Sequence, residues 1–169
     1  MTAGPAQEFE TPLERGINAV NEAIGRTVAW LLVAMVVLQM AVVVFRYVFG
    51  LGDPVAQDLI LYMHAIAFMT LAGYVLRHDA HVRVDLIYRE KGPRIKAAID
   101  LFGTVVFLWP MTGVMLWKSW PYVADSWSIR EGAARVSGIQ GTFILKTFLL
   151  VFALLLALQG VALAAASLR

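Results

Sequence analysis

The chain alternates long apolar runs with short polar clusters, and this alternation predicts its helices. Four runs without a charged residue cover positions 27–45, 59–76, 101–117 and 147–168, which is 19, 18, 17 and 22 residues. A transmembrane helix needs about 17–25 mainly apolar residues. Glycine and proline separate the runs at 50–54 and 92–93. With their flanks, the runs predict transmembrane helices over 26–49, 57–77, 93–123 and 142–168.

A shorter amphipathic helix is predicted before the first span, over 11–24. Thr11 followed by Glu14 is a capping box, and Pro12 suits the first helical position. One interpretation is a helix resting in the membrane interface, and the other is a plain extension of the next helix. Its apolar face carries Leu13, Ile17, Val20 and Ile24, while Glu14, Arg15, Asn18, Asn21 and Glu22 lie elsewhere.

The third and fourth spans carry signals for their shape and packing. Pro110 lies inside the third span and predicts a kink. The far end of that span is rich in aromatic residues, as an interfacial belt would be; these are Trp117, Trp120, Tyr122 and Trp127. The fourth span has small residues at helical spacing, which predict a close packing face; these are Ala153, Ala157, Gly160 and Ala164.

Composition and charge support an all-α integral membrane protein with a single membrane domain over 1–169. The chain is 60% hydrophobic and 15% charged, against about 45–50% and 25% in soluble domains. Nine Lys and Arg fall on the side of the termini and five on the other side, which predicts cytoplasmic termini. The basic residues form no nucleic-acid stripe. The absence of cysteine excludes disulfides and thiolate chemistry.

Few ionisable residues lie within the spans, and those that do are the candidate functional residues. His64 is well inside the second span, where we expect a neutral imidazole bonded to a neighbouring helix rather than a proton relay. Asp58 and Asp100 lie at span ends. We expect Asp58 to pair with Arg46, and Asp100 with Arg77.

The second span ends in a polar corner that contains His78 and His81 with Asp79 and Asp85. We interpret it as a solvated cluster at the membrane edge rather than a metal site. His64 and His78 share a helical face, at a spacing seen in haem-binding membrane helices. A second helix would have to supply partner histidines, and all three histidines fall between 64 and 81. No nucleophile–base pair, phosphate loop or metal-ligand spacing is present, so neither an enzyme nor a resident cofactor or metal is expected.

The segment 57–88 resembles the small permease subunit of tripartite ATP-independent periplasmic (TRAP) transporters, the DctQ-like family. The resemblance rests on Gln57-Asp58, the run through Ala72-Gly73, Arg77, and the corner His81-Val82-Arg83-Val84-Asp85. Gly138 to Gln159, with Leu145-Lys146 opening the last span and Leu158-Gln159-Gly160 late in it, is similar to the same family. Gln57 stands where many relatives have a second acidic residue.

The resemblance implies a partner subunit rather than an autonomous transporter. The chain would pair with a large, DctM-like permease subunit that holds the substrate and sodium sites, and a periplasmic binding protein would deliver an organic acid anion. The small subunit would extend the static scaffold in the bacterial inner membrane. His81, Arg83 and Asp85 would form a cytoplasmic anchor. Four basic residues would face lipid headgroups; these are Arg89, Lys91, Arg94 and Lys96.

Two other functions remain open from the residues alone. One is a membrane anchor of a respiratory enzyme, with haem or quinone near His64. The other is a small autonomous exporter. Such exporters depend on an acidic residue in the first span, whereas the only internal polar group there is Gln39.

Overall fold

The computed structural model describes residues 11–78, 92–133 and 138–168 and consists of helices over these ranges. In chain order they are α1 (Pro12–Val48), α2 (Pro54–Arg77), α4 (Pro93–Gly103), the π-helical turn η2 (Thr104–Leu108), α5 (Trp109–Ser128) and α6 (Thr142–Ser167). Four helical segments are long and apolar enough to cross a membrane, with α4, η2 and α5 forming the third. The predicted all-α membrane fold with four spans is therefore confirmed.

The helix ends follow local capping chemistry. The Thr11 hydroxyl accepts from the Glu14 amide, and the Glu14 carboxylate accepts from the Thr11 amide at 2.7 Å, which completes the predicted capping box. At the start of α2, the Asp53 carboxylate caps the Val55 amide at 2.9 Å. This cap, with Pro54 after it, begins α2 three residues before the predicted start at 57.

The third span differs most from its predicted form. It continues to Ser128 instead of 123, and a π-helical turn interrupts it directly before Pro110. There the Trp109 amide donates to the Thr104 carbonyl, five residues earlier. Proline has no amide hydrogen, and its ring clashes with the carbonyl four residues before it in a regular helix. The wider turn accommodates both effects, so the expected disturbance at Pro110 takes the form of a π-turn.

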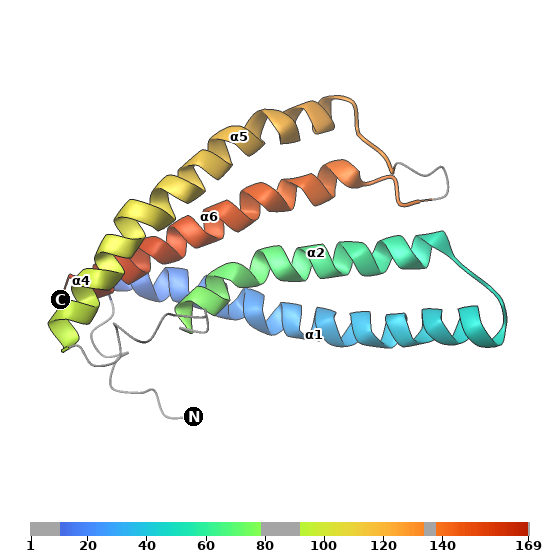
Figure 1. The fold of residues 1–169 in the computed structure, drawn as a ribbon, viewed down its shortest axis with the longest axis horizontal. Coiled ribbons are helices and arrows are strands. Elements are labelled where there is room, and N and C mark those ends of the chain that lie inside the picture. Colours follow the sequence, from blue (N-terminus) through green and yellow to red (C-terminus); the bar gives the residue numbers. More distant parts are fainter. Residues whose placement is uncertain (1–10, 79–91, 134–137, 169) are drawn as a thin grey trace.

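The four spans lie side by side, with α2 and α6 inside and α1 and α5 outside (Figure 1). In the most apolar 18-residue stretch of each helix, 39% of the residues are buried in α6 but only 6% in α1. Ala153, Gly160 and Ala164 are buried as predicted, while Ala157 is half-buried. A Cβ on Gly160 would lie 2.7 Å from Leu108. Small residues on α6 thus let the neighbouring span approach closely.

Candidate functional site

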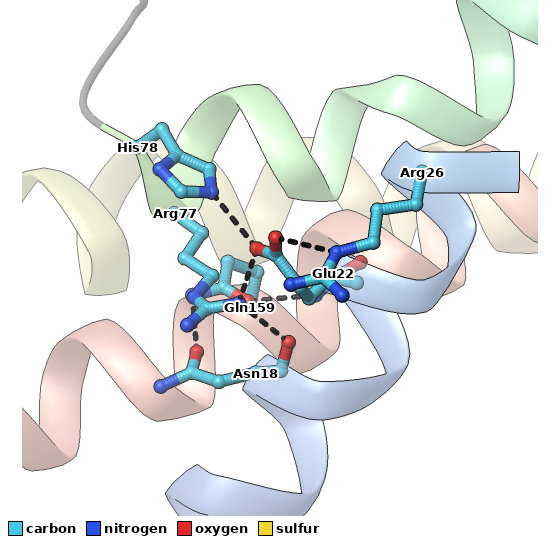
Figure 2. Close-up of polar contacts among 7 residues, drawn as sticks. Asn18, Glu22, Arg26, Arg77, His78 and Gln159 are labelled. Carbon is cyan, nitrogen blue, oxygen red and sulfur yellow. Dashed lines mark hydrogen bonds and ion pairs between the residues drawn. The ribbon is translucent and has the colours of Figure 1, made fainter. Parts of the chain in front are cut away.

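Polar side chains from three helices meet where α1 begins and where α2 and α6 end (Figure 2). We call this group the polar cluster. It contains Asn18, Asn21 and Glu22 of α1, Arg77 and His78 at the end of α2, and Gln159 of α6.

Three amides form the buried half of the polar cluster. The Asn21 amide nitrogen donates to Gln159 Oε1 at 2.7 Å, and Gln159 Nε2 donates to Asn18 Oδ1 at 3.2 Å. Asn21 is 1% exposed and Gln159 is 5% exposed. An amide that is buried in apolar surroundings is costly unless it is bonded. The relay therefore holds α1 against α6 in one register.

Charged groups form the outer half of the polar cluster. Arg77 Nη1 donates to the backbone carbonyl of Asn18 at 2.8 Å and to Glu22 Oε2 at 2.9 Å. His78 Nε2 lies 3.1 Å from the same carboxylate oxygen, and its ring packs on Tyr74 with centroids 4.3 Å apart. Arg26 reaches Glu22 Oε1 at 3.3 Å from the next turn of α1. One carboxylate thus connects the start of α1 with the end of α2.

Glycine makes this close approach of α1 and α2 possible. A Cβ on Gly25 would collide with the ring of Tyr74, and a Cβ on Gly73 would collide with the amide of Asn21. Small residues at helix contacts allow such approach in lipid. The Asn21 oxygen sits against Gly73 without a hydrogen-bond partner among the described residues.

The polar face of α1 is turned toward the protein rather than toward water. Glu14 and Asn21 are buried, whereas Leu13 is 61% and Val20 52% exposed. The separate interfacial helix expected over 11–24 is not formed, because α1 runs unbroken from Pro12 to Val48. The alternative of a plain extension describes the helix correctly. Its apolar side is left for lipid or a partner.

Of the two ion pairs expected from the sequence, neither is formed. The partner of Arg77 is Glu22, not Asp100, because the spacing of α1 places Glu22 next to the end of α2. Asp58 accepts from the Ile139 amide at 3.1 Å and so holds the loop before α6, with no bond to Arg46. Arg46 lies exposed in the last turn of α1, and Asp100 is half-buried in α4.

His64 has a different environment from the one expected. Its ring is exposed on α2, beside Gln39 and Gln57, and makes no hydrogen bond to another described residue. The expectation of a bond to a neighbouring helix of this chain is therefore wrong. Buried hydroxyl groups behave differently, since Thr70, Thr104 and Thr112 each donate to the carbonyl four residues earlier.

Several predicted residues lie outside the part of the chain that the structure describes. These are His81, Arg83, Asp85, Arg89 and Lys91, together with Asp79. The cytoplasmic-anchor role of the corner and the headgroup contacts stay predictions. Of the other headgroup candidates, Arg94 is exposed near the start of α4 and Lys96 is half-buried.

A second polar group closes the opposite end of the α5–α6 hairpin. Glu131 pairs with Lys146 and accepts from the Ser126 hydroxyl at 2.7 Å. The Lys146 ammonium also lies over the Tyr122 ring, 4.0 Å from its centroid. The hydrogen bond from Lys146, followed by that from Ser126, lowers the pKa of Glu131 below its ordinary value of 4.5. Trp127 reinforces the hairpin by donating to Thr147 at 2.9 Å.

The hydrogen bonds and ion pairs of the polar cluster join three helices. Within residues 11–78, 92–133 and 138–168, no group of three or more His, Asp or Glu could hold a metal ion. His78 is engaged by Glu22, and no second histidine is among the described residues that surround His64, so the haem or quinone anchor is not favoured.

Sequence reasoning predicted Arg77 as a site residue but missed most of the cluster. Asn18, Asn21 and Glu22 were placed only away from the apolar face of the N-terminal helix, and Gln159 was noted only for its place beside Gly160. The available signal was a single amide, Gln159, in an otherwise apolar run, because such a residue needs a partner in lipid.

Comparison with known proteins yields a family match. The matching family model is described as tripartite ATP-independent periplasmic transporters, DctQ component, and it covers residues 35–169. No curated protein and no solved structure matches the chain.

Proposed function

The chain belongs to the DctQ family of TRAP transporter components, and on this premise we propose that it is a static scaffold subunit without a transport site of its own. The family makes it the small permease subunit of a tripartite system and a multi-pass protein of the inner membrane. The proposal adds a large DctM-like subunit that binds substrate, sodium coupling, and a periplasmic protein that delivers an organic acid anion.

The observation that carries the scaffold role is the use made of the buried polar groups. Gln159 and Asn21 bond each other, and buried threonine hydroxyls bond their own helices. A substrate site near the bilayer midplane requires convergent polar groups and usually interrupted helices. Here the buried amides of Asn21 and Gln159 join two helices and the buried threonine hydroxyls bond their own backbone, which supports a rigid partner rather than a moving transport domain.

The exposed surfaces fit the same role. The outer helices α1 and α5 present many large apolar side chains, including Trp30 of α1 at 77% and Trp117 of α5 at 72% exposure. A chain that enlarges a membrane scaffold needs such surfaces toward lipid and toward its partner. The distribution of nine basic residues on the side of the termini against five supports cytoplasmic termini.

Reconstitution in liposomes tests this function. We expect sodium-driven uptake of an organic acid only when this chain, the large subunit and the binding protein are all present. Gln159→Leu should reduce the amount of assembled complex without changing the KM for substrate. Uptake by this chain alone would refute the scaffold role, as would a changed KM in complexes that assemble normally.

A further inference from the structure

The outward face of the α1–α2 hairpin carries a groove with polar side chains at membrane depth. The groove has a volume of about 440 Å³ and is lined by residues of both helices, including Gln39, Gln57, Ile60 and His64. A second groove of about 320 Å³ shares Gln39, Gln57 and Ile60 and extends to Arg46 and Tyr47. We call the two together the α1–α2 groove.

Two polar side chains of the groove, Gln39 and His64, lie close to the middle of the membrane. His64 is ten residues beyond Pro54, and Gln39 is nine residues before Val48. These separations correspond to about 15 and 14 Å along the two helices. Half of a hydrocarbon core of about 30 Å is the same distance. Gln39 and His64 are thus at similar depth, on adjacent antiparallel helices, and both are exposed.

These groups have hydrogen-bonding capacity that this chain does not use. Within the described ranges, the side chains of Gln39, Gln57, His64 and Arg46 make no hydrogen bond or ion pair. Acyl chains offer neither donors nor acceptors, so a lipid-filled groove would leave Gln39 and His64 unsatisfied. The exposed apolar surface of α5, by contrast, is what lipid solvates well.

The charge of the groove indicates what covers it. Arg46 contributes a cation at the outer end, and no acidic side chain lines either part. The neighbouring Asp58 faces the loop before α6 through its bond to Ile139. A complementary surface therefore presents hydrogen-bonding side chains at the depth of His64 and a carboxylate or carbonyl near Arg46.

We propose that the α1–α2 groove is the docking surface for a transmembrane helix of the large permease subunit. This inference rests on the proposed function, which supplies the partner. His64 and Gln39 bond polar groups of that helix, and Arg46 binds an acceptor at its outer end. The exposed histidine is then an interface residue and not part of a proton or cofactor site.

Site-directed photo-cross-linking tests the docking surface, because the chain contains no cysteine. Single variants Ile60→Cys and His64→Cys are labelled with a benzophenone maleimide in the complex with the large subunit. Val114→Cys, at an exposed position of α5, is the matched control. We expect a cross-link to the large subunit from positions 60 and 64 and none from 114.

The possible outcomes distinguish failure of the proposed docking surface from failure of the proposed function. A complex that assembles but cross-links only through position 114 would overturn the groove as the docking surface and leave the scaffold function standing. Cross-links from 60 and 64 to a second copy of this chain, or to lipid alone, would overturn it too. Failure of the two subunits to co-purify in the unlabelled wild type would instead refute the proposed function.

Discussion

The amide relay between α1 and α6 predicts a measurable coupling between Asn21 and Gln159. Gln159→Leu keeps the side-chain volume but removes both amide bonds of this residue. Stranding the buried donor of Asn21 costs about 1–3 kcal/mol, and loss of the interhelical bond to Asn18 costs about 0.6 kcal/mol more. We expect the free energy of unfolding to fall by about 2–4 kcal/mol.

A double variant tests whether Asn21 and Gln159 stabilise the chain through their bond to each other. Asn21→Leu with Gln159→Leu replaces both partners by apolar groups of similar shape, which leaves no stranded amide between them. Its loss of stability should be smaller than the sum of the single losses, by about 0.6–1.7 kcal/mol. The free energies can be measured by titration with a denaturing detergent, followed by tryptophan fluorescence.

A matched control separates the relay from the general effect of the substitution. Gln39→Leu is the same replacement at an exposed position without a side-chain bond to the described residues. In the isolated chain it should change stability by no more than about 0.5 kcal/mol. Additive losses in the double variant, or an equal loss in Gln39→Leu, would refute the assignment of the relay.

Three further predictions concern the helix contacts and the hairpin. Gly73→Ala should lower the free energy of unfolding, because its Cβ would collide with Asn21 and overpacking costs about 1–3 kcal/mol. Gly113→Ala is the control: nothing lies within 4 Å of its Cβ, so it should be neutral or slightly stabilising in the same assay. Exchanging the charges of Glu22 and Arg77 should restore part of the thermal stability lost in either single reversal, because their side chains pair at 2.9 Å; a double variant no better than the singles would contradict that pairing. The lowered pKa of Glu131 means that its ion pair contributes stability above pH 4.5, and that this contribution is lost as the pH falls through the folded-state pKa. The difference in melting temperature between wild type and Glu131→Gln should therefore be present at neutral pH and vanish in acid. A difference that stays constant with pH would contradict this assignment.

The positions of the helices were largely accessible from residue patterns. Capping by Thr11 and the breaks at Pro54 and Pro93 set helix starts, because these residues act on the adjacent backbone. The disturbance before Pro110 was predictable for the same reason, although the kink expected there takes the form of a π-turn.

The partners of polar side chains were much less accessible. Arg77 and Asp100 are at span ends on the same side, so sequence offered them as a pair, but helix packing brings Glu22 to Arg77 instead. Asp58 likewise meets a backbone amide 81 positions away. Contacts over such separations depend on helix order and rotation, which periodicity does not report.

By itself the sequence determined four membrane spans, their approximate ends and the inequality of basic residues between the two sides. Only the tertiary structure decided which face of each helix meets protein. A helical pattern groups residues on one face, but it does not say whether that face meets water, lipid or another helix. In α1 the polar face is buried against α2 and α6, and the apolar face is outermost. The physical reason is that lipid solvates apolar side chains, while the amides find hydrogen bonds only inside the protein.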